Sequence, residues 1–421
     1  MSDANIKNMK YTEESYNKII SELFSRHPSI QNVGFAPGAY KPGLDGMLAF
    51  SRSLGDPWKQ YKCIHVAGTN GKGSVSSMIA AGLASSGMRV GLYTSPHLTD
   101  FRERMKIISD GSWEMPRKEE ILEFVENSSL DGLSFFEVTT GMAFKWFADR
   151  HVDIAVIETG LGGRLDSTNI ITPIASVITS IGLDHCEMLG STRAAIAREK
   201  AGIFKPGVPA IVSARDPETR PVFEEVAAEK GCPLYFAEDY AGELFDTDLK
   251  GPHQDENLRT ALCTLDIIGI RPSRDAISRT AALTGFRGRW EKLLDSPETI
   301  CDIGHNPAAL EFNFRRLEQS GRPLFIVYGI MADKDISAIR PLMPQNARYY
   351  LAAPAIERAL PVDRLADIMT GLDISRHNSV KEAVEHAISD ASGVQDALVY
   401  IGGSNYLVSE CILLEFERHK N

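Results

Sequence analysis

Residues 61–86 read YKCIHVAGTNGKGSVSSMIAAGLASS, which places a strand-like run, a glycine-rich turn and a helix-like run in immediate succession. The strand-like run is 61–66, and small and apolar residues continue from Ser74 to Ser86. The turn between them is Gly68-Thr69-Asn70-Gly71-Lys72-Gly73-Ser74. Glycines let backbone N–H groups converge on anionic oxygens, the following helix presents its positive end, and Lys72 adds a charge. These features predict a phosphate-binding loop.

The loop departs twice from the strict pattern G-x-x-x-x-G-K-[ST]. Val66 stands five residues before Gly71, and Gly73 separates Lys72 from Ser74. A plain surface turn at 71–73 is therefore the alternative. The order of strand, glycine turn, lysine and helix favours phosphate binding and leaves the reaction open.

Strand-like and helix-like runs alternate along the whole chain, as in a mainly parallel sheet wrapped by helices. In the first part, further strands are predicted at 89–94, 154–157 and 175–179, and helices at 141–149 and 192–201. After residue 287, strands are predicted at 299–303, 324–328, 349–352 and 397–401, with a helix at 379–391. We therefore predict an α/β fold in two parts. A P-loop-type, mainly parallel sheet domain covers 1–287, and a smaller Rossmann-like α/β domain covers 288–421.

Polar residues follow three of the predicted strands. Ser95 comes directly after the predicted strand 89–94, Glu158 comes directly after the predicted strand 154–157, and His185 lies a few residues after the predicted strand 175–179. Sheets of this class bind ligands beyond the carboxyl ends of their strands, and a carboxylate there suits Mg²⁺. The ordinary alternatives are a turn at Ser95, a structural histidine at His185 and, further on, a solvated helix lysine at Lys200.

Composition narrows the class of protein. A formal net charge of −11 argues against a general nucleic-acid binder, whose footprint is a basic face. The polar segment Met1–Lys10 does not resemble a secretory signal, and no apolar run is long enough to span a membrane. The 6 cysteines show no Cys-x-x-Cys spacing, which favours reduced, buried thiols over disulfides or a zinc site. We expect a cytoplasmic monomer that binds neither nucleic acid nor membrane.

Several longer motifs accompany the loop, in order along the chain. They are Thr94-Ser95-Pro96-His97-Leu98, Phe101-Arg102-Glu103-Arg104, Phe135-Phe136-Glu137, the run 158–169 (ETGLGGRLDSTN), the run 196–203 (IAREKAGI), His253-Gln254 with Asn257, Gly288-Arg289, and 302–307 (DIGHNP). Together they resemble the folylpolyglutamate synthase and dihydrofolate synthase family of the Mur-ligase superfamily. The spelling Gly-Lys-Gly-Ser is that family's version of the loop. The resemblance covers nearly the whole chain and implies a Mur-ligase-like fold.

The resemblance also implies an ATP-dependent acid–amino-acid ligase. ATP phosphorylates a carboxylate of dihydropteroate or of a reduced folate, and the amino group of L-glutamate then displaces phosphate. Lys72, Lys200 and His185 would be catalytic. The nucleotide would be held by Gly68, Thr69, Asn70, Gly71, Lys72, Gly73, Ser74, Asn257, Arg289, Asp302 and His305. Two Mg²⁺ ions would be held by Ser95, Glu158, His185 and Lys200, the last as a carbamate.

For the pterin, the resemblance implies a pocket formed by Ser134, Phe135, Phe136, Glu137, Leu165, Asp166 and Ser167. An aromatic pair suits a flat heterocycle. Plain core packing of Phe135 and Phe136 is the alternative. One departure is Ile303, a β-branched residue where the family has glycine, so we expect the local backbone there to differ.

Three alternatives to a bifunctional folate ligase stay open. The first is a folylpolyglutamate synthase without the second activity. The second is a Mur-type peptide ligase, which should lack Phe135-Phe136-Glu137 and carry an N-terminal UDP-binding domain. The third is a regulatory module that binds ATP without ligase activity.

Overall fold

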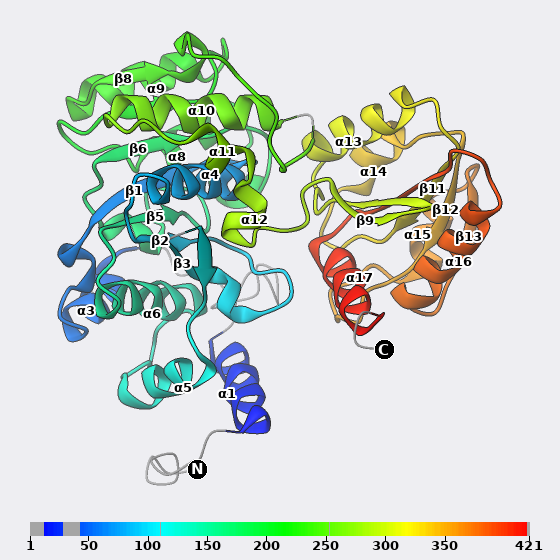
Figure 1. The fold of residues 1–421 in the computed structure, drawn as a ribbon, viewed down its shortest axis with the longest axis horizontal. Coiled ribbons are helices and arrows are strands. Elements are labelled where there is room, and N and C mark those ends of the chain that lie inside the picture. The colour runs from blue at the N-terminus through cyan, green and yellow to red at the C-terminus, as the bar shows by residue number, and fades with distance from the viewer. Residues whose placement is uncertain (1–11, 28–42, 110, 252, 419–421) are drawn as a thin grey trace. The chain divides into compact units, whose positions relative to one another are not determined.

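The computed structural model describes residues 12–27, 43–109, 111–251 and 253–418. The segment Met1–Lys10, predicted not to be a secretory signal, lies outside the described residues. The chain forms two compact units, each with its own sheet (Figure 1). The first comprises 1–97, 102–246 and 255–285, and the second comprises 98–101, 247–254 and 286–421. The second unit thus includes two short segments, 98–101 and 247–254, that come before residue 287 in the chain. A single boundary at residue 287 assigns both segments to the first part. One is anchored by Ser409, whose Oγ donates to the Leu98 carbonyl at 2.6 Å.

The sheet of the first unit has the strand order β4-β3-β2-β5-β1-β6-β7-β8. Pairing is parallel from β2 to β8, and β3 and β4 form an antiparallel edge. The strands are β1 (Lys62–Ala67), β2 (Val90–Tyr93), β3 (Met105–Ser109), β4 (Ser112–Glu114), β5 (Ile154–Glu158), β6 (Ala175–Ile178), β7 (Ala210–Val212) and β8 (Leu234–Phe236).

The helices that wrap this sheet begin with α1 (Glu13–Arg26) and α3 (Asp45–Ser53). The others are α4 (Lys72–Ala84), α5 (Lys118–Asn127), α6 (Phe135–Asp149), α7 (Cys186–Leu189), α8 (Arg193–Ala201), α9 (Arg220–Lys230), α10 (Gln254–Ile267), α11 (Arg274–Ser278) and α12 (Thr280–Thr284). Short 3-10 helices are η2 (Pro57–Gln60), η3 (Phe101–Arg104), η4 (Ser167–Ile170) and η5 (Ala237–Asp239). Helix α4 is buried on nearly all sides, which its run of glycine, serine and alanine permits.

The second unit is a smaller sheet in the order β13-β12-β11-β14-β10-β9, parallel except for β9. Its strands are β9 (Glu291–Asp295), β10 (Glu298–Cys301), β11 (Leu324–Tyr328), β12 (Ala347–Leu351), β13 (Asp373–Arg376) and β14 (Leu398–Gly402). Its helices are α13 (Pro307–Gln319), α14 (Ile336–Ile339), η6 (Arg340–Leu342), α15 (Val362–Ile368), α16 (Val380–Ser392) and α17 (Asn405–Arg418).

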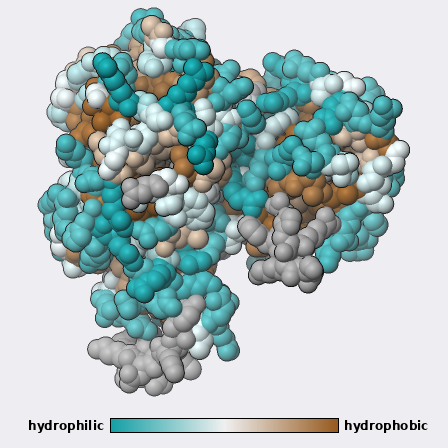
Figure 2. Space-filling view, viewed as in Figure 1, coloured by the Kyte–Doolittle hydropathy of each residue, from teal (hydrophilic) through white to brown (hydrophobic). Residues whose placement is uncertain are grey.

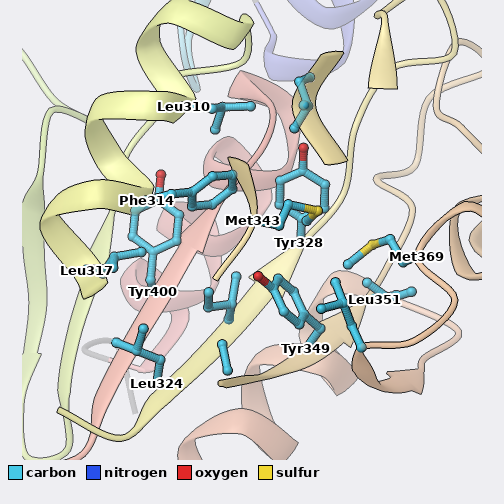
Figure 3. Close-up of a cluster of buried hydrophobic side chains, with 14 of the residues drawn as sticks. Leu310, Phe314, Leu317, Leu324, Tyr328, Met343, Tyr349, Leu351, Met369 and Tyr400 are labelled. Carbon is cyan, nitrogen blue, oxygen red and sulfur yellow. The ribbon is translucent and has the colours of Figure 1, made fainter. Parts of the chain in front are cut away.

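Alternate residues of β11 enter two separate cores, one on each face of the second sheet. Ile326 and Tyr328 pack with α13 in the core shown in Figure 3, where Leu310, Phe314 and Leu317 meet Tyr400 of β14. Phe325 and Val327 pack on the opposite face with α16 and α17. The period-two burial explains why this strand is an unbroken apolar run in the sequence.

The predicted α/β class is confirmed, and the predicted strands of both parts correspond to β1, β2, β5, β6, β10, β11, β12 and β14 within about two residues. Helix α6 differs, because it begins at Phe135 rather than near Gly141. Gly141 is not a helix start: a Cβ there would lie 2.3 Å from Cε1 of Phe50, so glycine lets α3 and α6 approach closely.

On the face drawn in Figure 2, hydrophilic residues cover most of the surface of both units. None of the helices built from the described residues combines the length and apolar composition needed to cross a membrane. The cysteines are buried as predicted except Cys186, which is exposed. The prediction of a buried thiol is wrong at that position.

Candidate active site

Four neighbouring parallel strands of the first sheet, β2, β5, β1 and β6, end at the same edge. Val66 pairs with Glu158, Tyr93 with Ile157, and Ala67 with Ile178, so these strand ends are level. Ser95, Glu158, the loop 68–74 and the segment 179–185 therefore follow one another along this edge. This is the position at which doubly wound sheets bind ligands.

The loop 68–74 needs glycine at two positions. Gly68 has φ +154°, and a Cβ there would lie 1.7 Å from Thr179 Oγ1. Gly71 has φ +85° and caps α4, and a Cβ there would lie 2.3 Å from Asn257 Oδ1. The same close approach brings Asn257 of α10 onto the loop, beside the predicted nucleotide residues.

The segment after β6 fixes the loop in place, which the sequence pattern did not reveal. Thr69 N donates to the Ser180 carbonyl at 2.7 Å, and Thr179 Oγ1 donates to the Asn70 carbonyl at 2.6 Å. The Thr69 hydroxyl donates to the Gly182 carbonyl at 3.1 Å. The only signal in the sequence was the polar pair Thr179-Ser180 at the end of an apolar strand.

Two lysines share one backbone carbonyl in this loop. Lys72 Nζ lies 3.1 Å from the Gly68 oxygen, and Lys200 Nζ lies 2.7 Å from it. Lys200 is only 4% exposed, so the alternative of a solvated helix lysine is wrong. Burial, reinforced by the charge of Lys72, lowers the pKa of Lys200 to about 7, while Asp184 and Asp166 act in the opposite direction. A large fraction of Lys200 is therefore a neutral amine at physiological pH.

Close packing between α8 and the loop 160–169 positions Lys200. A Cβ at Gly163 would lie 2.7 Å from the Lys200 carbonyl, and a Cβ at Gly202 would lie 2.3 Å from Cβ of Arg164. Arg164 N also donates to the Glu199 carbonyl at 2.8 Å. Gly163 and Gly202 thus let the end of α8 approach the loop 160–169 closely, and this packing directs Lys200 toward the phosphate loop.

The predicted metal ligands are partly brought together. Glu158 is 3% exposed, and its Oε2 accepts a hydrogen bond from Ser95 N at 3.3 Å. His185 has φ +51° at the start of α7, and its N–H donates to Asp184 Oδ1 at 3.0 Å. A buried carboxylate needs a compensating positive charge, and carboxylate and hydroxyl oxygens are ligands that suit Mg²⁺. With imidazole added, the set also suits Mn²⁺, so these residues fit a divalent ion.

Ser134 and Glu137, predicted in the pterin pocket, form a capping box at the start of α6. Ser134 N donates to Glu137 Oε2 at 2.7 Å, and Glu137 N donates to Ser134 Oγ at 3.2 Å. The spacing Ser-x-x-Glu is itself a helix-start signal, and reading it would have placed the helix correctly.

The two phenylalanines that follow differ in their surroundings. Phe135 is buried and stacks on Phe24, with ring centroids 4.5 Å apart. Phe136 is half-buried, 5.9 Å from the ring of Tyr93, and lies over Gly160, where a Cβ would be 2.5 Å from its Cζ. Core packing thus describes Phe135, whereas Phe136 is only half-buried and lies beside the loop 160–169.

Asp166, another predicted pterin residue, is 3% exposed and holds the backbone of the loop 160–169 in place. Its carboxylate accepts hydrogen bonds from Gly160 N at 2.9 Å, Leu161 N at 2.8 Å and Thr168 N at 3.0 Å. Leu165 is half-buried and Ser167 is buried beside it. Asp166 therefore fixes the backbone between Glu158 and Lys200.

We expect Asp166→Ala to lower the free energy of unfolding by about 3 kcal/mol, because it leaves several buried N–H groups without an acceptor. Urea denaturation followed by circular dichroism measures this. Asp166→Asn keeps one amide oxygen as acceptor and should cost less. The exposed Asp131→Ala is the matched control. A loss below about 0.5 kcal/mol for Asp166→Ala, the scale of an ordinary surface substitution, would contradict this role.

The remaining predicted nucleotide residues lie in the second unit. Asp302 accepts hydrogen bonds from Trp290 N at 3.0 Å, Gly304 N at 2.8 Å and Asn313 Nδ2 at 2.7 Å. Arg289 lies over the ring of Phe286, with 4.8 Å from guanidinium carbon to centroid. The His305 ring lies near the Ile303 carbonyl, with Nδ1 at 3.0 Å.

Ile303 itself does not have the positive φ that would strain its β-branched side chain. In the segment that pairs with Ile303, positive φ occurs at Gly288 (+74°) and at Trp290 (+49°). Ile303 N donates to the Gly288 carbonyl at 3.1 Å. A Cβ at Gly288 would lie 2.8 Å from Ile303 Cγ2, so glycine at 288 makes room for isoleucine at 303.

Two protein families match the chain: the Mur ligase middle domain over residues 66–262, and the Mur ligase, glutamate ligase domain over residues 288–405. The folylpolyglutamate synthase of Lacticaseibacillus casei is 32% identical over 400 residues, which cover 86% of this chain and 92% of that protein. The structure of Escherichia coli FolC in complex with DHPP and ADP is similar with a TM-score of 0.81 and 29% identity, covering 96% of this chain and 98% of that one. The Yersinia pestis bifunctional folylpolyglutamate synthase/dihydrofolate synthase, complexed with AMPPNP and a Mn ion, has a TM-score of 0.81 and 29% identity, covering 95% and 97%.

Proposed function

This chain belongs to the folylpolyglutamate synthase and dihydrofolate synthase family of Mur-type ligases, and we propose that it joins L-glutamate to dihydropteroate and to reduced folates at the expense of ATP. One observation supports this most: the phosphate loop, Glu158 and the buried Lys200 lie at the carboxyl edge of adjacent parallel strands. Similar enzymes have been solved with ADP, AMPPNP and Mn. A folylpolyglutamate synthase without the second activity is the nearest alternative.

The chain's own residues suit a two-step ligation. In the first step, a carboxylate oxygen of the folate attacks the γ-phosphorus of ATP, ADP leaves, and an acyl phosphate forms. In the second, the amino nitrogen of L-glutamate attacks the acyl carbon and loses a proton, and inorganic phosphate leaves. The loop N–H groups and Lys72 would stabilise the charge on the transferring phosphoryl group, which is the largest demand of such chemistry.

Ser95, Glu158, His185 and Lys200 would hold the divalent ions, which supply charge neutralisation on the phosphates. For Lys200 this requires a carbamate. Its neutral amine nitrogen can attack the carbon of CO₂ and lose a proton, which turns a cation into an anion. A pKa of about 7 keeps enough neutral amine for this step, whereas an ordinary lysine, at 10.5, is almost fully protonated.

Phe136 is the residue of the predicted pterin set that we expect to stack on the heterocycle, since it is aromatic and only half-buried. Ser134, Glu137, Leu165, Asp166 and Ser167 would act through the shape of the surrounding backbone. Nucleotide contacts by Asn257, Arg289, Asp302 and His305 stay predictions. The same holds for a cytoplasmic monomer that binds neither nucleic acid nor membrane.

Phosphate release with ATP, Mg²⁺ and L-glutamate tests the proposal. We expect release with dihydropteroate and with tetrahydrofolate, and none with a UDP-linked muropeptide. Release with tetrahydrofolate alone would leave the folylpolyglutamate synthase alternative. Activity only with the muropeptide would overturn the folate assignment. ATP binding without release under any condition would favour a regulatory module.

A further inference from the structure

Three residues of the second unit gather potential metal-binding atoms where β13 ends and α16 begins. His377 follows β13, whereas Glu382 and His386 lie four residues apart on α16 and so on the same helix face. One candidate ligand atom from each lies within 4.8 Å of the other two. We propose that His377, Glu382 and His386 bind one divalent transition-metal ion, with Zn²⁺ the best fit.

The hydrogen bonds of His377 leave one ring nitrogen available to a cation. Ser375 donates its only hydroxyl hydrogen to the Tyr349 carbonyl at 3.2 Å. The same oxygen lies 2.9 Å from His377 Nε2, so it accepts the Nε2 hydrogen. This fixes the tautomer in which Nδ1 carries a lone pair. An outer acceptor that orients a histidine in this way is the usual second partner of a metal-binding imidazole.

That lone pair is buried and unused. His377 is 7% exposed, and its Nδ1 has no hydrogen-bond partner among the described residues. A buried polar atom of this kind costs free energy unless a ligand satisfies it.

The side chains of Glu382 and His386 make fewer contacts than His377 and can rotate toward an ion. Asn378 fixes one oxygen of Glu382, with its backbone N at 2.8 Å and its Nδ2 at 3.3 Å from Oε2. This leaves Oε1 for an ion. His386 is exposed, and its ring meets that of His377 at 5.0 Å between centroids and 72° between planes. Ligand atoms around tetrahedral zinc lie about 3.3 Å apart, so a modest rotation of the two outer side chains completes the set.

The neighbouring acidic residue, Asp390, is engaged elsewhere. Its Oδ2 accepts from Tyr350 OH at 2.7 Å and pairs with Arg348 at 2.8 Å. The site thus has three protein ligands, two imidazoles and one carboxylate. This set is found in zinc sites that keep a fourth position for water, whereas Mg²⁺ and Ca²⁺ prefer oxygen alone. The proposed ion site does not depend on the ligase assignment.

Zinc binding by the full chain tests the proposal. The chain is stripped with chelator and titrated with ZnCl₂ by equilibrium dialysis, in excess Mg²⁺ so that the site in the first unit is occupied. We expect His386→Ala to lose one equivalent of bound Zn²⁺. Ser375→Ala should weaken that equivalent by about 10- to 100-fold, because it releases the His377 tautomer. Co²⁺ in place of Zn²⁺ should give an absorption band for tetrahedral nitrogen–oxygen ligation, absent in His386→Ala.

Glu382→Gln is compared with Glu385→Gln, which removes an exposed carboxylate from the same helix. Loss of binding in the first and retention in the second supports the proposal. His386 is exposed, so its substitution should leave the fold intact, and circular dichroism checks this. Equal stoichiometry and affinity in His386→Ala and the parent chain would overturn it.

Discussion

Lys200→Arg is expected to lower the rate of folate-dependent phosphate release by roughly 10²–10³-fold, the scale of losing one preorganised charged group from an active site. Arginine keeps a positive charge and can still donate toward the Gly68 carbonyl, which accepts from Lys200 at 2.7 Å. It stays protonated at working pH and cannot form a carbamate. ATP affinity should change far less, because the loop and Lys72 stay in place.

The control for this substitution is Lys205→Arg, five residues further on. Lys205 also donates to a backbone carbonyl, that of Asn169 at 3.0 Å, but lies outside the proposed metal set. Lys200→Ala adds a second measurement, since a small carboxylic acid such as acetate can occupy the vacated space and restore part of the activity. Turnover of Lys200→Arg within threefold of the parent would remove the carbamate from the mechanism.

The pH dependence of activation follows from the same residue. Carbamate formation needs the neutral amine, whose fraction rises with pH until it saturates above the pKa of about 7. Enzyme freed of CO₂ and then given a fixed concentration of dissolved CO₂ should therefore recover activity faster at pH 8 than at pH 6. A lysine with an ordinary pKa of 10.5 would still show a tenfold rise for each pH unit above 8. Absence of levelling there would contradict the lowered pKa.

Gly68→Ala is expected to cost about 3 kcal/mol of folding stability, the upper range for forcing atoms into a packed site. The new Cβ would lie 1.7 Å from Thr179 Oγ1, whose hydroxyl also holds the Asn70 carbonyl. Thr179 and the loop must then move apart. If two N–H contacts to phosphate are lost at about 1.5 kcal/mol each, ATP affinity falls roughly 100-fold. Thermal unfolding and nucleotide titration measure the two effects.

Two comparison variants separate steric clash from other causes. Gly87→Ala lies just beyond α4 at φ +83°, where a Cβ meets nothing within 4 Å, so it should cost only about 1–2 kcal/mol of backbone strain and leave ATP binding intact. Lys72→Ala removes charge without clash and should weaken ATP binding with little loss of stability. Equal stability of Gly68→Ala and the parent would show that Thr179 does not confine the loop.

The sequence was sufficient to predict the elements that have a local hydrophobic pattern. Apolar β-branched runs identified the central strands, because strands buried on both faces leave a continuous signal. Strands β7 and β8, with only three residues each in Ala210–Val212 and Leu234–Phe236, are too short to show one. The edge strands β3 and β4 were missed for a different reason. In β3 the buried Lys106 interrupts the apolar residues, and only its tertiary contacts with the Thr284 and Gly285 carbonyls explain its burial, whereas β4 is exposed.

The sequence predicted which residues lie at the candidate site, but it did not predict the contacts that these residues make with one another. Polar residues after strands indicated the right edge of the sheet. The burial of Lys200 arises from glycines 163 and 202, which bring two distant segments together, and no periodicity reports such packing. Likewise, the contacts of Thr179 and Ser180 with the loop join residues about 110 positions apart. Phe135 and Phe136 are identical neighbours in sequence, and only tertiary packing distinguishes them.

The segments 98–101 and 247–254 complete the second unit from earlier parts of the chain. Leu98 packs beside the core of Val408 and Cys411, and its carbonyl accepts from Ser409. A polypeptide that starts at residue 288 would therefore expose apolar surface and lose an anchor for α17. The C-terminal part from residue 288 is thus not a transferable module. During synthesis, part of its core leaves the ribosome nearly two hundred residues ahead of the rest, so the second unit can mature only after the first has been made.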